Sequence, residues 1–226
     1  VCAQHNNGGL AGDLWWESNI GGLFPVGEVN GSHGVRRPGG ASLNAGQVGA
    51  LRAAMRIANR RRTGAPAAAD VARAAAGQAA ACLGLARALQ HPQPGDRLAV
   101  HDVRREIQSR MSRAGAHIRR LDTEREARDD AWRLCGHLDA RAWVSGPAEL
   151  PDAFRNRDLA LAHAVYLTAI TEYLERGGLS RGSFLVVDGT GAWTLNPPGA
   201  FVDERILEVS VGLDGTPRTE WVAIRP

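Results

Sequence analysis

The feature that most constrains the fold of this 226-residue chain is a run of apolar side chains at helical spacing. Its members follow one another at intervals of three or four residues: Val100, Val103, Ile107, Met111, Ala114, Ile118 and Leu121. Because an α-helix has about 3.6 residues per turn, such a run forms one stripe along one face of an amphipathic helix. A stripe of this kind is stabilised by packing against other elements, so the pattern predicts a helical body in the middle of the chain.

Four more helices are expected around this stripe, and each is ended by glycine or proline. They are predicted at 47–62, 67–90, 124–143 and 156–176, and their ends lie near Gly64, Pro92, Gly146 and Gly177. The last of them has an apolar face made of Leu159, Ala162, Tyr166, Ile170 and Tyr173. Helices joined by short loops pack most simply as an antiparallel bundle.

The two ends of the chain differ from this helical middle. The start is rich in glycine, while the tail has β-rich runs at 183–187 and 206–211 and a hairpin turn at 213–216 leading into 220–224. We therefore predict an α+β fold that is mainly α. Its parts are a Gly-rich α/β segment at 1–52, an antiparallel helical bundle at 53–178 and a short strand-rich tail at 179–226.

Two motifs in the Gly-rich start have properties of a ligand site. In residues 5–9, His5 precedes Gly8 and Gly9, and glycine lets the backbone come close to a ligand because it has no Cβ. In residues 22–29, a short apolar run ends in Gly27 and Glu28. It resembles a strand with a carboxylate at its C-terminal end, which is where α/β sheets bind ligands. Taken singly, each motif also fits a loop histidine or a surface glutamate.

A third motif, at residues 33–43, runs through Arg37 to Ser42 and Leu43 and is followed at once by a helix. The backbone N–H groups at a helix start are unpaired, and that end carries roughly half a positive charge. Such an end suits a phosphate, or a heterocycle that becomes anionic when it is reduced. The motif lacks the lysine and the spacing of a P-loop, which argues against a nucleoside triphosphatase.

In this order, the three motifs resemble the C-terminal flavin-binding segment of the fumarate reductase, succinate dehydrogenase and L-aspartate oxidase flavoproteins. The family pattern is His, two residues, Gly-Gly; then Gly-Leu-(apolar)-Gly-Glu; then His-Gly-x-x-Arg-x-Gly-x-x-Ser-Leu and a helix. Every fixed element of it is present between His5 and Leu43. Looser similarity continues at 105–108, Met111, Gly115, Arg119 and 179–182, which we interpret as mainly packing and ion-pair residues.

The resemblance implies that FAD is the cofactor and that the Gly-rich segment completes a flavin-binding domain. Glu28, after Gly27, would hold a hydroxyl on the sugar-like part of FAD. The backbone amides of Ser42 and Leu43 would face the pyrimidine edge of the flavin and stabilise negative charge on the reduced ring.

The resemblance also implies two residues that act on the substrate. His5 and Arg37 would bind carboxylate or carbonyl oxygens beside the flavin, a role that suits the planar fork of a guanidinium group. We therefore expect an FAD-dependent oxidoreductase that transfers hydride between flavin and a small organic substrate, a carboxylate being one candidate. The adjacent Trp15 and Trp16 are expected to pack beneath a loop; the alternative is an aromatic wall of the substrate site.

Two parts of the family pattern are absent from these 226 residues: the Gly-x-Gly-x-x-Gly dinucleotide fingerprint and the cap domain. We expect the 226 residues alone to be inactive, and we interpret a chain that begins at Val1 as a fragment or a processed piece. The expected partners are the missing FAD and cap part, in the same enzyme or in a partner subunit, and an electron-transfer partner. The electron donor or acceptor and the mode of FAD attachment stay open.

Composition excludes several other classes. A net charge of +3 and an arginine cluster at 60–62, interpreted as a solvated helix end, argue against nucleic-acid binding. Cys2, Cys82 and Cys135 lack metal-ligand spacing, so no metal is expected, and unpaired thiols favour a reducing compartment such as the cytoplasm. No apolar run is long enough to cross a bilayer. The alternative function is a non-enzymatic helical interaction module, or one subunit of a split oxidoreductase.

Overall fold

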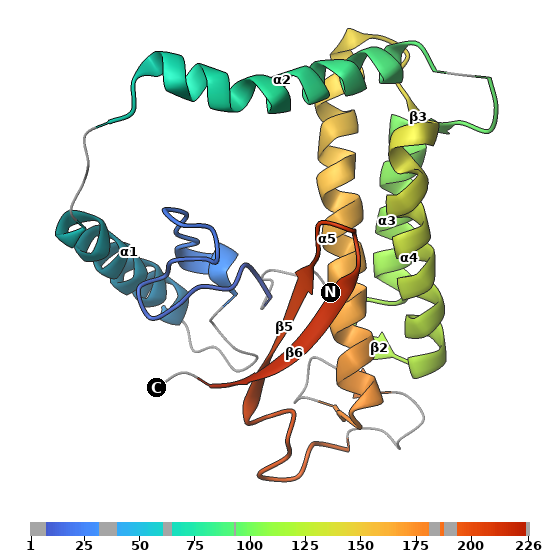
Figure 1. Ribbon diagram of the computed structural model, residues 1–226. Helices are drawn as coiled ribbons and strands as arrows, with labels where there is room; N and C mark the ends of the chain where they lie inside the picture. The colour runs from blue at the N-terminus through green and yellow to red at the C-terminus, as the bar shows by residue number, and fades with distance from the viewer. Residues whose placement is uncertain are drawn as a thin grey trace. The chain divides into compact units, whose positions relative to one another are not determined.

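A computed structural model describes residues 8–31, 40–60, 65–92, 94–180 and 194–224, together with the backbone of 186–187. The chain forms two compact units, which divide between residues 66 and 67. The described residues contain five α-helices and three two-stranded sheets, so the predicted α+β, mainly α class is confirmed (Figure 1). The three-part division at 52/53 and 178/179 stays a prediction.

The first unit is a long loop laid along one helix. The loop, residues 8–31, contains the short 3-10 helix η1 (Gly27–Asn30), and the helix is α1 (Ala41–Asn59). The helix predicted at 47–62 thus begins six residues earlier, after Gly40, whose left-handed backbone (φ 82°) turns the chain into it. The strand expected at 22–29 is wrong, because its end is η1 and 23–26 has no strand partner among the described residues.

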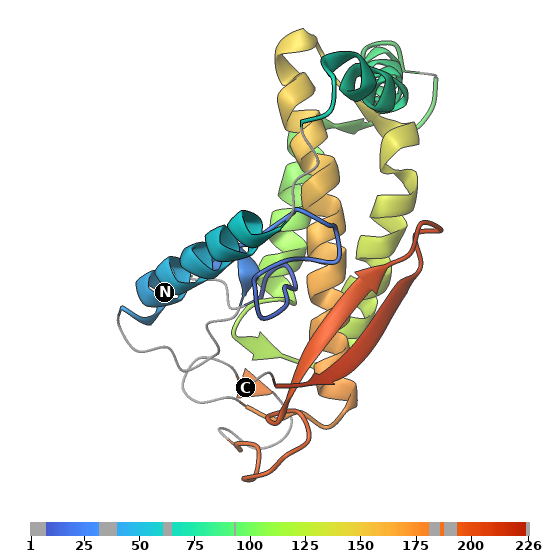
Figure 2. The same cartoon turned by 60° about the vertical axis from the view of Figure 1, so that its left-hand side comes forward.

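Three long helices form the body of the second unit: α3 (Val100–Arg113), α4 (Leu121–Arg141) and α5 (Leu150–Glu175). Strand β1 (Leu98–Ala99) precedes α3 and pairs with β3 (Ala142–Trp143), which follows α4. The start of α3 and the end of α4 therefore lie at one end, and the two helices are antiparallel. After η2 (Pro147–Glu149), α5 runs back beside them, as both views show (Figures 1 and 2).

The single helix predicted over 100–121 is wrong, because the chain breaks between α3 and α4. Here Ile118 belongs to strand β2 (Ile118–Arg119), where its side chain is 62% exposed. The Arg119 guanidinium donates to the carbonyl oxygens of Gly115 (3.3 Å) and Ala116 (3.1 Å). These bonds satisfy carbonyl groups just beyond the end of α3, so the chain can leave the helix there.

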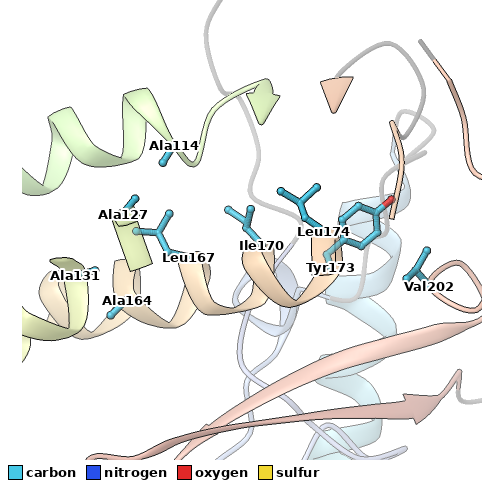
Figure 3. Packing of buried hydrophobic residues seen from close by; sticks show 9 residues of the cluster. All are labelled: Ala114, Ala127, Ala131, Ala164, Leu167, Ile170, Tyr173, Leu174 and Val202. Carbon is cyan, nitrogen blue, oxygen red and sulfur yellow. The ribbon is translucent and has the colours of Figure 1, made fainter. Parts of the chain in front are cut away.

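Helix α5 is the centre of the core; Ile170 and Tyr173 of its predicted face are buried, but the N-terminal part of that face is not. Leu159 is 39% exposed, whereas Leu167 and Thr171 are fully buried. The Thr171 hydroxyl donates to the Leu167 carbonyl (2.7 Å), which removes the cost of burying a polar group. The main cluster joins α3, α4, α5 and the tail (Figure 3), and consists of Ala114, Ala127, Ala131, Ala164, Leu167, Ile170, Tyr173, Leu174 and Val202.

The predicted helix at 67–90 and the predicted hairpin are both confirmed. Helix α2 (Ala68–Gln90) buries only Leu89, near its C-terminal end. Strands β5 (Arg205–Val211) and β6 (Pro217–Ala223) pair antiparallel, and the hairpin is anchored to α5 by a bond from Trp221 Nε1 to Glu172 (2.9 Å). Of the strand expected at 183–187, only β4 (Val186–Val187) is described, and it pairs with β2. Among the described helices, none combines the length and the apolarity that crossing a bilayer would require.

Candidate functional site

The predicted cofactor-binding residues lie in two neighbouring elements of the first unit. Gly27 and Glu28 open η1, and Ser42 and Leu43 are in the first turn of α1. The predicted substrate-binding pair, His5 and Arg37, lies outside the described residues. Their roles therefore stay predictions, and the described part of the candidate site consists of the other four residues.

Helix α1 meets the loop through one face of small and basic residues. This face follows helical spacing, four and three residues apart in turn, and consists of Ser42, Gly46, Gly49, Ala53, Arg56 and Arg60. A Cβ built on Gly46 would lie 3.7 Å from the Cα of Gly27, so η1 sits against this face. Because Ser42 precedes Gly46 by about one turn, the Gly27–Glu28 turn lies near the N-terminal end of α1. Glu28 is exposed to solvent there.

The start of α1 has the electrostatic properties expected of an anion site. Its N-cap is Gly40, which has no side chain to cap the helix, and the first turn has no acidic residue. The first hydrogen bond of the helix runs from the Asn44 amide to the Gly40 carbonyl (3.1 Å). The amides of Ser42 and Leu43 precede it, so they have no acceptor within the helix and carry the positive end of its dipole.

The second glycine of the first motif, Gly9, is explained by contact with the protein's own backbone. A Cβ on Gly9 would lie 2.2 Å from the Val29 carbonyl oxygen, and one on Gly31 would lie 2.3 Å from the Gly9 nitrogen. The Leu10 amide also donates to the Val29 carbonyl (2.7 Å). The segment that follows His5 is therefore fixed against the turn that carries Glu28.

Glu17, which no sequence motif selects, is a buried carboxylate that contacts the other end of α1. Its side chain is 7% exposed. It pairs with Arg60 (2.5 Å), the C-cap of α1, and with Arg56 (3.6 Å) in the last turn of that helix. A hydrogen bond from the Gly22 amide (2.9 Å), together with Arg60, holds the pKa of the Glu17 carboxyl below its usual value. Arg60, part of the predicted solvated helix end at 60–62, is the C-cap of α1 and is 44% exposed, and it is also an ion-pair partner. Residues 61–62 lie outside the described residues.

The two tryptophans pack as the first of their two interpretations predicts. The indole of Trp16 covers Gly49, where an added Cβ would lie 2.9 Å from the ring. The guanidinium of Arg52 lies 5.6 Å from the ring centre of Trp15 and 5.9 Å from that of Trp16. This packing holds the loop against the middle of α1.

The residues of looser similarity in the bundle also have structural roles. Buried Arg110 pairs with Glu106 and shares a hydrogen bond with the buried His163 (3.1 Å). The side chain of Met111 folds over Gly115, where a Cβ would lie 2.5 Å from its methyl group. Two grooves on the second unit are lined by bundle and hairpin residues, and neither includes a predicted site residue.

Comparisons with known proteins find no match to the sequence among family models and curated proteins, but they find solved structures with the same fold. No protein-family model matches the chain, and no curated protein matches it in sequence. Quinol fumarate reductase FrdA from E. coli, solved with one point mutation, matches with a TM-score of 0.69 and 22% identity over 97% of this chain. A quinol-fumarate reductase with menaquinol molecules matches with a TM-score of 0.67 and 22% identity over 98% of this chain. The chain has the fold of a C-terminal portion of the fumarate reductase flavoprotein.

This finding confirms the predicted resemblance at the level of the fold. The chain spans 36% and 37% of the lengths of the two matched chains, so it corresponds to little more than a third of each.

Proposed function

We propose that this chain is the C-terminal part of an FAD-dependent oxidoreductase, and that η1 and the start of α1 hold the flavin. The observation that carries the proposal is the position of Gly27 against Gly46, next to the uncapped first turn of α1. A carboxylate and two amides that have no acceptor within the helix are thus held on one small scaffold. That the chain has the fold of part of fumarate reductase supports the same conclusion.

The described residues fit FAD by the chemistry of their donors and acceptors. Glu28 is exposed and can accept hydrogen bonds from a hydroxyl of the sugar-like part. The amides of Ser42 and Leu43 can donate to the electron-rich edge of the ring, and the helix dipole favours negative charge at that point. Bound FAD supplies the hydride chemistry, while the protein orients the substrate and tunes the charge.

The substrate is proposed to be a small organic molecule, with a carboxylate as the first candidate. His5 and Arg37 are the proposed substrate-binding residues, because an imidazole and a guanidinium together can hold carboxylate or carbonyl oxygens. The remaining FAD and cap parts are proposed to come from the same enzyme or from a partner subunit, with a further electron-transfer partner. The 226 residues alone are expected to be inactive with added FAD.

Two variants in the complete product of the reading frame test these roles separately. Glu28→Ala should lower FAD content, because a cofactor contact is lost. Arg37→Ala should leave FAD content near the wild-type value and slow the reoxidation of chemically reduced flavin by fumarate, used as the first carboxylate probe. Glu126→Ala, an exposed change on α4, is the control and should alter neither quantity.

The outcomes are distinct. If Arg37→Ala lowers the FAD content and the rate of flavin reoxidation by the same factor, Arg37 is a cofactor-binding or structural residue. If wild-type protein holds FAD but neither fumarate nor other unsaturated carboxylates reoxidise it, the carboxylate substrate is rejected and the flavin proposal stands. If wild-type protein holds no FAD, the flavin proposal fails, and a helical interaction module becomes the better interpretation.

A further inference from the structure

The loop of the first unit touches α1 at three points along one helical face. Gly27 lies on Gly46 near the start of the helix, and Trp16 covers Gly49 one turn further on. Glu17 reaches the far end of the helix, where it pairs with Arg60. These contacts place the loop in one register along the helix, and of the three only the last is an ion pair.

Glu17 connects both elements that carry the proposed flavin contacts. One carboxylate oxygen, Oε1, accepts the amide proton of Gly22, which begins the segment leading to Glu28. The other, Oε2, lies 2.5 Å from the Arg60 guanidinium at the C-cap of α1, the helix whose first turn contains Ser42. The buried side chain of Glu17 therefore connects the segment that leads to Glu28 with the helix whose first turn contains Ser42.

The backbone next to Glu17 needs such support. Trp16 has φ 60°, the one positive φ found among non-glycine residues of the described chain. A bulky residue in this region is strained and persists only where its surroundings hold it there. Asp13 supplies local support, because its carbonyl accepts from the Trp16 amide (3.0 Å) and its carboxylate accepts from the Glu17 amide (2.9 Å). The contact of Trp16 with Gly49 and the bonds of the Glu17 carboxylate hold this turn on α1 and on the segment after it.

We propose that Glu17 is a positioning residue for the flavin site. Its carboxylate fixes the register of residues 18–28 along α1 and so places Glu28 beside the amides of Ser42 and Leu43. This role rests on the proposed function, since it has meaning only where those groups contact FAD. A carboxylate is required because two oxygens must serve an amide and a guanidinium at once.

The test uses Glu17→Gln, Glu17→Asp and the control Glu126→Gln in the complete product of the reading frame. The dissociation constant for FAD and the visible circular dichroism of the bound flavin are measured well below the melting temperature. Glu17→Gln should weaken FAD binding about tenfold, because a displaced Glu28 loses a charge-assisted hydrogen bond to the cofactor, and the loss of such a bond lowers affinity by at least about that factor. It should also change the dichroism; Glu17→Asp should partly restore both, and Glu126→Gln should match wild type.

Together with the melting temperature, these measurements distinguish a positioning role of Glu17 from a purely stabilising one. If Glu17 only stabilises the fold, Glu17→Gln will lower the melting temperature while FAD affinity and dichroism stay at wild-type values. That result overturns the proposal. If Glu17→Gln does not fold, Arg60→Gln breaks the same ion pair from the helix side. It should weaken FAD binding in the same direction, and wild-type affinity would overturn the proposal. A wild-type protein that binds no FAD refutes the proposed function instead.

Discussion

Replacing Glu124 by glutamine should remove a pH-dependent weakness from the bundle. Glu124 is the fourth residue of α4 and is fully buried, on the same face as Ala127 and Ala131. Neither of its carboxylate oxygens has a hydrogen-bond partner among the described residues. Burial raises the pKa of the Glu124 carboxyl from 4.5 to about 7, although the positive charge of Arg119 acts in the opposite direction.

The magnitude follows from the difference in pKa between the folded and the unfolded chain. One pKa unit corresponds to about 1.4 kcal/mol, so the rise from 4.5 to about 7 corresponds to about 3 kcal/mol. Below pH 4.5 the group is protonated in both states and has no differential effect. As pH rises from 4.5 to about 7, the unfolded chain releases the proton that the fold retains, so stability falls. Above that range the full loss of about 3 kcal/mol is present.

Glu124→Gln keeps the shape of the side chain and cannot ionise. Its free energy of unfolding, measured by urea titration and circular dichroism, should therefore lack this fall between about pH 5 and about pH 8. Relative to wild type, the variant should gain about 2.5 kcal/mol over that interval, because part of the loss is already present at about pH 5. Glu126→Gln, an exposed change two residues away, should follow wild type. A difference between Glu124→Gln and wild type that is the same at both pH values would refute the reasoning.

Two further predictions compare matched positions by the same urea titration. Leu167→Ala should cost about 2–5 kcal/mol because it leaves a cavity in the core, whereas Leu161→Ala, at a side chain that is 45% exposed on the same helix, should cost far less. Similar losses would contradict the assigned face of α5. Gly49→Ala should destabilise the first unit and shift tryptophan fluorescence, because its Cβ would lie 2.9 Å from Trp16. Gly77→Ala, in α2 with no atom near the added methyl group, should stabilise by about 0.5–1 kcal/mol through helix propensity. Stabilisation by both changes would show that Trp16 does not rest on Gly49.

Local periodicity was enough to predict most of the helices and the C-terminal hairpin. It failed at Ile118, where the spacing of the stripe continues by chance across a break made by Arg119 bonding to backbone carbonyl groups. On α5 it selected the buried Ile170 and Tyr173 but missed Thr171, a polar residue whose burial depends on its bond to the Leu167 carbonyl. Both errors come from hydrogen bonds that leave no trace in a pattern of apolar residues.

The candidate site, too, could be predicted only in part from the sequence. The Gly27–Glu28 and Ser42–Leu43 pairs could be selected from the order of the motifs, and the structure places both pairs near the start of α1. The supporting contacts were missed. Glu17 lies among loop residues with no periodic signal, and its partner Arg60 is 43 residues away in the sequence. Only the small-residue face of α1, through Gly46 and Gly49, signals in retrospect that another segment lies close to the helix.

The measurement that bears most directly on the central claim is the visible absorption spectrum of the complete product of the reading frame, as purified and after addition of FAD. The spectrum of oxidised flavin, bleached by a chemical reductant and retained through gel filtration, is the predicted result. A protein that stays colourless under both conditions would contradict the assignment of Glu28, Ser42 and Leu43 to a flavin site.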